Sequence, residues 1–291
     1  MVAFETFHHT EMTEELFLLE LPDTMSLSVK EVQELLRSLE SPEPALLGKL
    51  ARDPRQTVRK LAYRGLRKGG SLAKNENLFR RDPIRELAGA DEAGRGALAG
   101  PIVAAAVVFE PGVVIKGVND SKLLTPEQRE ELYEEITRRA KGVSVSFVDA
   151  PLIDRWGIQV ANMKALGDAV MGIHTLCQCV ICDHFTLKGL PVPSFGIPKA
   201  DATFQSVAAA SIVAKVERDR VMCSLHERFP YYNWINNKGY ATSEHMSAIE
   251  EFGHCEVHRQ SFSGVLPAEL DEALWDEEEI GDGGVAEEQS E

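Results

Sequence analysis

Four acidic residues of this 291-residue chain stand at the ends of predicted structural elements, where their carboxylates could meet. Asp91 and Glu92 end the segment ELAGADE, Asp183 closes CVICD, and Asp201 lies in KADATFQS just before a long helical segment. Gathered carboxylates repel each other unless a cation compensates, and all-oxygen ligand sets suit Mg²⁺ or Mn²⁺. Two such ions about 4 Å apart can activate a water and stabilise the leaving oxygen of an in-line phosphoryl displacement. The pattern therefore favours metal-dependent phosphoryl chemistry.

The segment Gly94-Arg95-Gly96 directly follows the first two acids. Glycines allow backbone N–H groups to approach a ligand closely, so this corner is a candidate binding loop. A dinucleotide-binding fingerprint fits poorly, because this G-x-G precedes an apolar strand rather than opening a helix. A plain turn is the alternative interpretation.

Two of the acids near the long helical segment have ordinary structural interpretations. By itself Asp201 reads as a helix cap, with its charge moderated by the helix N-terminus and by Lys199. Asp219 lies well inside the helix and is predicted to belong to an ion-pair network with Lys215 and Arg218. The pattern alone does not separate these roles from metal binding.

A second set of potential metal ligands surrounds one predicted strand: Cys177, Cys179, Cys182, His174 and His184. A zinc site is the alternative here, but the spacing fits no familiar zinc finger, and alternating cysteines on a buried strand usually act as small apolar residues. His254 and His258 are interpreted as local structure or substrate contacts. No Ser-His-Asp order and no P-loop pattern is present.

The spacing of apolar residues after residue 85 predicts the strands and helices that must position these residues. Strands are predicted for ELAGAD, PIVAAAVVF, VSVSFVDA and CVICD, and PIVAAAVVF is so apolar that both of its faces should be buried. Helices are predicted for TPEQREELYEEITRRAKG, IQVANMKALGDAVMGIH, SVAAASIVAKVERDRVMCSLHERF and SEHMSAIEEFG. Thr125, Pro126 and Gln128 give the first of these helices a capping box. The order β-β-α-β-α-β-α-α indicates an α/β domain over residues 86–265.

Residues 26–80 are predicted to form a small helical basic domain. SVKEVQELLRSLE has helical spacing with Ser28 as N-cap, and PEPALLGKLARDP and RQTVRKLAYRGLRKGG read as two more short helices. Residues 45–85 carry a charge of +9 within a chain of net charge −15. A basic block beside a catalytic domain fits the binding of phosphates, and a solvated helix face is the alternative.

The two ends of the chain are predicted to lie outside these domains. Residues 1–25 read as a loose N-terminal arm, and residues 266–291 as an acidic disordered tail. The first residues carry acids where a signal peptide has Lys or Arg, no stretch is long and apolar enough for a membrane span, and the five cysteines are odd in number. We therefore expect a cytoplasmic protein.

Five blocks after residue 86 resemble the ribonuclease HII (type 2 ribonuclease H) family, in the family's order. They are DEAGRGALAGPIVAAAVV, NDSKLLTPEQREELYEEI, IDRWGIQVANMKAL, KADATFQSVAAASIVAKVERDR and NNKGYATSEHMSAIEEFGHCEVHRQSF. The resemblance implies a ribonuclease H-like mixed sheet flanked by helices. Family members commonly have Pro at Ala97, and bacterial members often have Gly at His184. The N-terminal helices only loosely resemble an extension found in some members.

The resemblance also implies the roles of individual residues. The family's metal-binding acids fall on Asp91, Glu92, Asp183 and Asp201, which favours Asp201 over Asp219. Gly94, Arg95 and Gly96 would recognise the ribonucleotide through its 2′-hydroxyl. Tyr240 would stack on the sugar at the RNA–DNA junction, although a half-buried core tyrosine is the alternative. Ser121, Lys122 and Lys199 resemble phosphate contacts.

The implied activity is that of a metal-dependent endonuclease. It would cut RNA in RNA–DNA hybrids and nick on the 5′ side of a ribonucleotide embedded in duplex DNA. Two Mn²⁺ or Mg²⁺ ions would take part, leaving a 3′-hydroxyl and a 5′-phosphate, and the enzyme is expected to be a monomer. The alternatives are a module that binds RNA–DNA hybrids without cutting them, and the sister type ribonuclease HIII, whose N-terminal domain contains β-structure.

Overall fold

A computed structural model of the chain describes residues 27–38, 50, 72–79, 86–118, 121 and 124–266. Several predictions lie outside these residues. They are the loose arm at 1–25, the tail beyond residue 266, the two predicted helices within residues 42–70 except for Leu50, and the phosphate contact predicted for Lys122.

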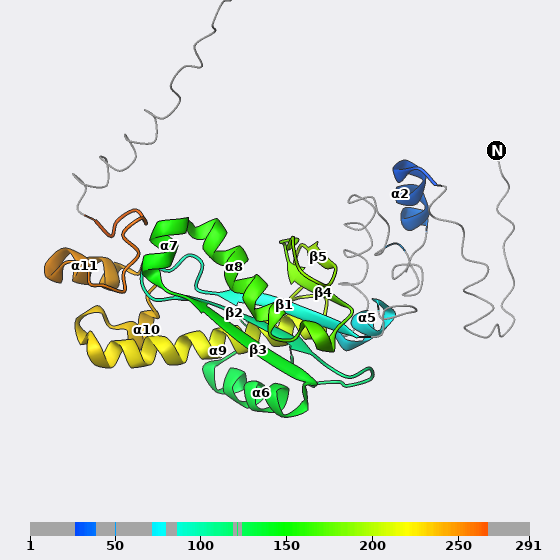
Figure 1. The fold of residues 1–291 in the computed structure, drawn as a ribbon, viewed down its shortest axis with the longest axis horizontal. Helices are drawn as coiled ribbons and strands as arrows, with labels where there is room; N and C mark the ends of the chain where they lie inside the picture. Colours follow the sequence, from blue (N-terminus) through cyan, green and yellow to red (C-terminus); the bar gives the residue numbers. More distant parts are fainter. Residues whose placement is uncertain are drawn as a thin grey trace, which may run out of the picture.

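A five-stranded mixed sheet forms the centre of the molecule (Figure 1). The mixed sheet that the family resemblance implied is confirmed, and four of its strands were predicted from the sequence, whereas the fifth was not. Its order is β3-β2-β1-β4-β5, with β1 (Leu87–Ala93), β2 (Ile102–Val108), β3 (Gly142–Val148), β4 (Cys179–Asp183) and β5 (Ser194–Ile197). The strands β1, β2 and β3 pair antiparallel, whereas β1, β4 and β5 pair parallel. Every residue of β2 is buried, in agreement with its continuous apolar sequence.

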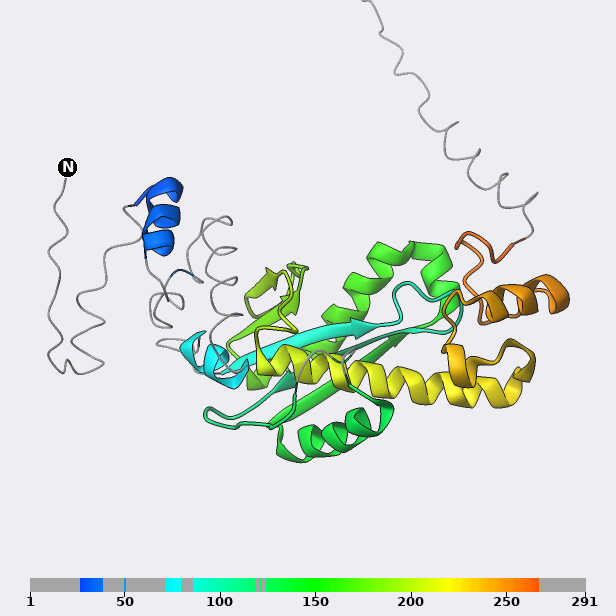
Figure 2. The same cartoon turned by 180° about the vertical axis from the view of Figure 1, so that it is seen from behind.

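Helices cover both faces of the sheet, because both faces are apolar. On one face, α8 (Ile158–Met171) packs over β1, β2 and β3, and α7 (Ala150–Trp156) precedes it. On the other face, α9 (Gln205–Arg228) runs along β1 and β2 beside α6 (Pro126–Arg139), as Figure 2 shows from behind. The predicted capping box of α6 is present: Thr125 Oγ1 accepts from the Gln128 backbone, and the Gln128 side chain accepts from the Thr125 N–H.

The chain after α9 forms a small cap at one end of the sheet. It contains a short 3₁₀ turn (Pro230–Tyr232), α10 (Trp234–Asn237) and the predicted α11 (Ser243–Phe252). An apolar cluster that includes Trp234, Tyr232 and Met222 holds this cap against α9. The cap matters for the site because it carries Tyr240.

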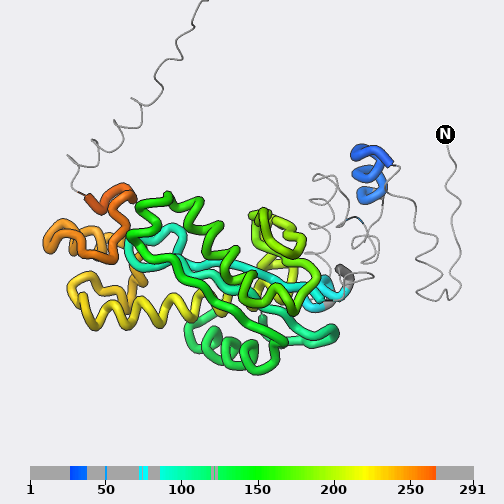
Figure 3. Tube along the Cα trace, in the orientation of Figure 1, coloured from blue at the N-terminus to red at the C-terminus, as the bar shows by residue number. Residues whose placement is uncertain are grey.

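The described part of the N-terminal region consists mainly of two helices. The predicted helix after Leu27 is α2 (Val29–Ser38), and Ser28 caps it, since Glu31 N donates to Ser28 Oγ at 3.3 Å. The second helix, α5 (Leu72–Phe79), was not predicted. Figure 3 shows α2 at one end of the molecule and the end of the described chain at the other. None of the described helices is long and apolar enough to cross a membrane.

Candidate active site

The two adjacent acids at the end of β1 point to opposite faces of the sheet, because side chains alternate along a strand. Asp91 is directed towards α9, where the Ser211 hydroxyl hydrogen-bonds to it, and it is only 8% exposed. Glu92 is directed towards α8, where Asn162 lies beside it. The alternation of side chains along a strand accounts for this divergence, but the sequence could not identify Ser211 or Asn162.

Parallel pairing brings the third acid next to the first. The last paired residues of β1 and β4 are Ala90 and Cys182, and in each strand the next residue is an acid, Asp91 and Asp183. The Asp183 carboxylate is fixed by the turn that follows β5, since its Oδ1 accepts from Ala200 N at 2.9 Å. The parallel register therefore explains why carboxylates 92 residues apart meet.

The fourth acid, Asp201, is not the N-cap of α9. That position is Phe204, which has no side-chain hydrogen bond to the helix. Asp201 Oδ1 accepts from the neighbouring Ala202 N at 2.9 Å, and the residue is 8% exposed. The cap interpretation of Asp201 is wrong. Asp219 forms the predicted ion pair with Lys215, whose Nζ lies 2.6 Å from its Oδ1. The predicted partner Arg218 instead donates to the backbone oxygens of Pro101, Ala99 and Lys238.

All four acids line one pocket of about 250 Å³. The other lining residues are Ala93, Gly94, Arg95, Gly96, Ser121, Ser211, Lys215 and Tyr240. The structure thus brings together the acids, the glycine loop, Ser121 and Tyr240 from the sequence prediction. Lys199 is exposed and does not line this pocket.

The acids of this pocket destabilise one another's charged forms. Burial raises the pKa of Asp91 well above its ordinary value, and the neighbouring charges of Glu92 and Asp183 raise it further. Burial also raises the pKa of Glu92 to about 7, with a smaller contribution from Asp183, while the Arg95 guanidinium opposes the shift. A compensating cation would relieve this repulsion.

The chemistry of the pocket fits a hard divalent cation. The Glu92 Oε2 atom is buried and has no hydrogen-bond partner among the residues that the structure describes, so it is an unused oxygen donor. Within the described ranges, no group of three or more acids, histidines or cysteines already has the spacing of a metal site. The acids therefore share a pocket without converging on one point. Among the described residues, Cys177, Cys179, Cys182, His174 and His184 do not form such a group either, which argues against the zinc alternative.

Two buried arginines hold the backbone of residues 94–99 in place through hydrogen bonds to its carbonyl oxygens. Arg259 donates to Gly94 O at 2.7 Å and to Arg95 O at 2.9 Å, and Arg218 donates to Ala99 O at 3.0 Å. A Cβ atom at Gly94 would lie 1.9 Å from Arg218 Nε, so the close contact requires glycine. Burial, together with the like charge of Arg218, lowers the pKa of Arg259 to about 9, so Arg259 remains a cation at neutral pH.

Tyr240 faces the pocket from the C-terminal cap. It is half-buried, with the guanidinium of Arg218 5.2 Å and the ammonium of Lys215 5.7 Å from the centre of its ring. Its backbone oxygen lies 3.0 Å from Nδ1 of the buried His245. The ring is therefore positioned by contacts that the sequence alone did not reveal.

His184, the departure from the family pattern, keeps a backbone conformation that favours glycine. Its φ of +63° lies in the left-handed region, which costs most residues energy. Its N–H donates to Ile197 O at 3.1 Å, so the turn after β4 stays paired to β5. The departure therefore leaves Asp183 in place.

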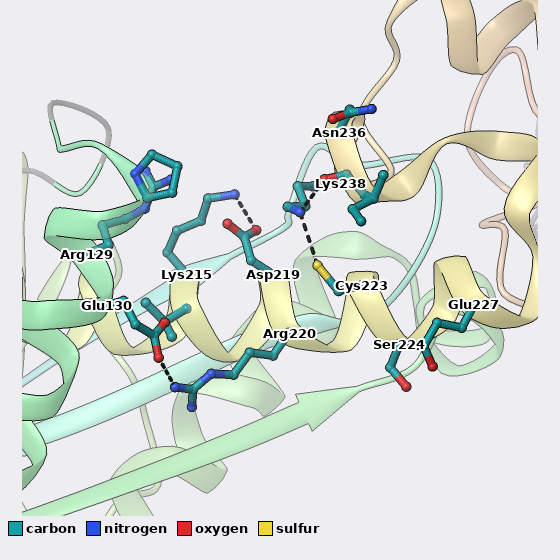
Figure 4. Close-up of a pocket in the computed structure, with 13 residues that line it drawn as sticks. Arg129, Glu130, Lys215, Asp219, Arg220, Cys223, Ser224, Glu227, Asn236 and Lys238 are labelled. Carbon is teal, nitrogen blue, oxygen red and sulfur yellow. Dashed lines mark hydrogen bonds and ion pairs between the residues drawn. The ribbon is translucent and has the colours of Figure 1, made fainter.

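A second, larger hollow has a volume of about 780 Å³. Figure 4 shows the residues that line it, many of which lie on α9. It contains none of the four acids, and Lys215 is the residue that it shares with the acid pocket. Its cations are largely balanced: Lys215 pairs with Asp219 and Arg220 with Glu130. Although this hollow is larger than the acid pocket, it lacks the four acids, so we do not assign it as the reaction site.

Comparison with known proteins identifies relatives for most of the chain. A sequence model of the Ribonuclease HII family matches residues 88–265, which include all four acids. The chain is 43% identical over 202 residues to the ribonuclease HII of Salinispora tropica, covering 69% of this chain and 75% of the relative. It is 45% identical over 195 residues to that of Geotalea uraniireducens, covering 67% and 90%. The crystal structure of the ribonuclease H2 from Pyrococcus horikoshii OT3 has a TM-score of 0.53 at 25% identity, covering 65% of this chain and 99% of that chain.

Proposed function

This chain belongs to the ribonuclease HII family of metal-dependent hydrolases that cut the RNA strand of RNA–DNA hybrids, and we propose that it also nicks duplex DNA 5′ of a single embedded ribonucleotide. The observation that carries the proposal is the shared pocket, in which four carboxylates lie beside the Gly94–Gly96 loop and Tyr240. A loop that contacted one sugar at the cleavage point would suit a substrate with a single ribonucleotide.

Each lining residue has a separate task in this proposal. Asp91, Glu92, Asp183 and Asp201 would hold two Mn²⁺ or Mg²⁺ ions, which when bound supply water activation and stabilisation of the leaving oxygen. Cleavage leaves a 3′-hydroxyl and a 5′-phosphate.

Recognition of the substrate falls to the other side of the pocket. The backbone of Gly94, Arg95 and Gly96 would contact the 2′-hydroxyl, the group that separates RNA from DNA at one position. The Tyr240 ring would stack on the next sugar, and Ser121 would contact a phosphate. Lys122 and Lys199 stay predicted phosphate contacts, Lys199 from outside the pocket lining.

Cleavage mapping tests the proposal. The substrate is an end-labelled DNA duplex with one internal ribonucleotide, and its all-DNA counterpart is the control. In Mn²⁺ or Mg²⁺ we expect a single nick on the 5′ side of the ribonucleotide and no cut in the all-DNA duplex. A cut that resists EDTA and ends in a cyclic phosphate would overturn the proposal, because the 2′-hydroxyl would then be the nucleophile.

A hybrid-binding module without nuclease activity is the rival function, and one substitution separates the two. Asp183→Asn keeps the side-chain shape and the oxygen that accepts from Ala200 N but removes a charge from the pocket. We expect turnover to fall by about three orders of magnitude, equivalent to about 4 kcal/mol of lost transition-state stabilisation, while duplex binding is retained. Asp168→Asn, an exposed acid paired with Lys164 on α8, is the matched control and should behave like wild type. A pure binder would show no difference between the two variants.

We further infer the setting in which the enzyme works. The chain has five cysteines, an odd number that supports a reducing cytoplasm rather than a disulfide framework. We propose a monomer in which residues 26–80 form a basic helical accessory domain that binds nucleic-acid phosphates, and residues 266–291 an acidic tail. Light scattering in solution should give the mass of one chain, and a stable dimer would contradict it.

A further inference from the structure

Helix α5 lies outside the segment matched by the family, yet it contacts the turn that carries Asp201. Asn75 and Glu76 are each only 2% exposed. Asn75 Nδ2 donates to Thr203 O at 3.2 Å, and Ser206 N donates to Glu76 Oε2 at 2.6 Å. Both contacts join residues more than 120 positions apart in sequence. They end within five residues of Asp201.

The contact made by Glu76 replaces a missing helix cap. The first N–H groups of a helix have no partner inside the helix and are usually satisfied by a side chain at the N-cap. In α9 that position is Phe204, which cannot accept a hydrogen bond through its side chain. Glu76 supplies the acceptor from another helix, and an acidic group at this end also complements the helix dipole.

The first helical turn of α9 also contacts both segments that carry acids of the pocket, the Asp201 turn and β1. On one side, the turn before it is fixed by Thr203, whose Oγ1 donates to Lys199 O at 2.8 Å and whose N–H donates to Ala200 O at 2.9 Å. On the other side it touches β1, since a Cβ at Gly89 would lie 2.2 Å from Ser206 C. Gly89 is two residues before Asp91. A shift of this helical turn would therefore displace Asp201 and press on the strand that carries Asp91.

We propose that Asn75 and Glu76 are positioning residues of the nuclease, through which the N-terminal region holds Asp201 in its place in the acid pocket. The inference rests on the proposed function for its catalytic readout alone. It gives α5 a role distinct from substrate binding by the basic segment, because both side chains are buried against α9 and are not available to a phosphate.

Three variants of full-length protein test the proposal: Glu76→Ala, Asn75→Ala and the conservative Glu76→Gln. Loss of a group that orients a metal ligand typically costs about 10- to 100-fold in metal affinity or activity. For Glu76→Ala we expect kcat to fall and the Kd for Mn²⁺ to rise about tenfold, the lower end of that range, with an unchanged KM for the duplex. Asn75→Ala should act in the same direction. Glu76→Gln keeps an acceptor oxygen and should stay close to wild type.

A readout without metal separates positioning from general destabilisation. In hydrogen-exchange mass spectrometry of the metal-free protein, Glu76→Ala should speed exchange in the peptide covering residues 200–207 and leave peptides of β2 and β3 unchanged. Asn77→Ala, on the exposed side of the same helix, is the matched control and should alter none of these quantities.

The outcomes are distinct. If Glu76→Ala lowers the melting temperature but keeps wild-type kcat, Mn²⁺ affinity and local exchange, α5 is only a structural brace and the proposal is overturned. If the wild-type protein fails to cut any ribonucleotide-containing duplex, the proposed function fails, while Mn²⁺ binding and exchange still decide the positioning role.

Discussion

At the scale of single residues, Gly94 and Gly96 serve the pocket in different ways. Gly94 has a φ of +90° and touches Arg218, whereas a Cβ at Gly96 would meet nothing within 4 Å. We therefore expect Gly94→Ala to destabilise the fold by about 2–4 kcal/mol through backbone strain and overpacking. Gly96→Ala should change stability by no more than about 0.5 kcal/mol.

The same pair of variants tests whether the loop backbone approaches the substrate. Gly96→Ala adds a methyl group at the pocket, so kcat/KM on a ribonucleotide-containing duplex should fall about tenfold, equivalent to about 1.4 kcal/mol. Urea denaturation and initial rates give the two quantities. Full activity in Gly96→Ala would show that the backbone at this position does not contact the substrate closely.

The acids of the site could be predicted from the sequence, but the residues that hold them could not. An acid at the end of an apolar strand is visible as a local pattern, which located Asp91, Glu92 and Asp183. Asp201 required the family resemblance, because a local pattern cannot distinguish an acid near a helix from its cap. Arg259 hydrogen-bonds to backbone oxygens about 160 residues away, and no side-chain pattern marks such a partner.

At the scale of elements, the strongly patterned segments were predicted, including the short strand β4, whereas β5 and α5 were missed. The capping box of α6 and the continuous apolar run of β2 are properties of the segments themselves. In contrast, β5 has only four residues, three of them half-buried, and α5 has eight. Such elements are stabilised by tertiary contacts rather than by their own sequence, as the hydrogen bonds of α5 to α9 illustrate.

The turn that joins β4 to the rest of the sheet contains removable strain. His184 has a φ of +63°, and glycine adopts this conformation without the Cβ clash. We expect His184→Gly to stabilise the protein by about 0.5–1 kcal/mol, measured by urea denaturation, because relief of strain outweighs the added chain entropy of glycine. His254→Gly replaces an exposed histidine without a positive φ and should give no gain. Equal effects at both positions would contradict the strain argument.

At the scale of the whole molecule, the C-terminal cap should make stability depend on pH. His258 Nδ1 accepts from Cys255 N at 3.0 Å, and its Nε2 lies 3.1 Å from Nε2 of His245, which accepts from Trp234 Nε1 at 3.0 Å. These partners require both rings to be neutral. Burial and the neighbouring His245 lower the pKa of His258 from 6.5 to about 4.

The sign of the effect follows from this lowered pKa. Below about pH 6.5 the unfolded chain binds a proton at His258 that the folded protein does not accept until about pH 4. Stability should therefore be unaffected by this group above about pH 7 and fall by about 2–3 kcal/mol as the pH drops from 6.5 to 4. Urea denaturation across this range should show a shallower loss for His258→Gln. Parallel curves for the two proteins would exclude His258 as the cause.

From the acid pocket we predict that Asp183→Asn affects the melting temperature in opposite directions with and without Mn²⁺. A ligand that binds only the folded protein stabilises it by about 2.7 kcal/mol at a free concentration of 100 times its Kd, so Mn²⁺ should raise the melting temperature of the wild type by about 5 °C or more. Asp183→Asn should abolish this rise. In the metal-free protein, however, the same substitution should raise the melting temperature, because Asp183 contributes to the repulsion felt by Asp91 and Glu92. Asp168→Asn should change neither quantity. A substitution that merely damaged the fold would lower the melting temperature both with and without Mn²⁺. A higher melting temperature without metal, together with loss of the Mn²⁺-induced rise, is therefore specific to carboxylates that a cation holds together.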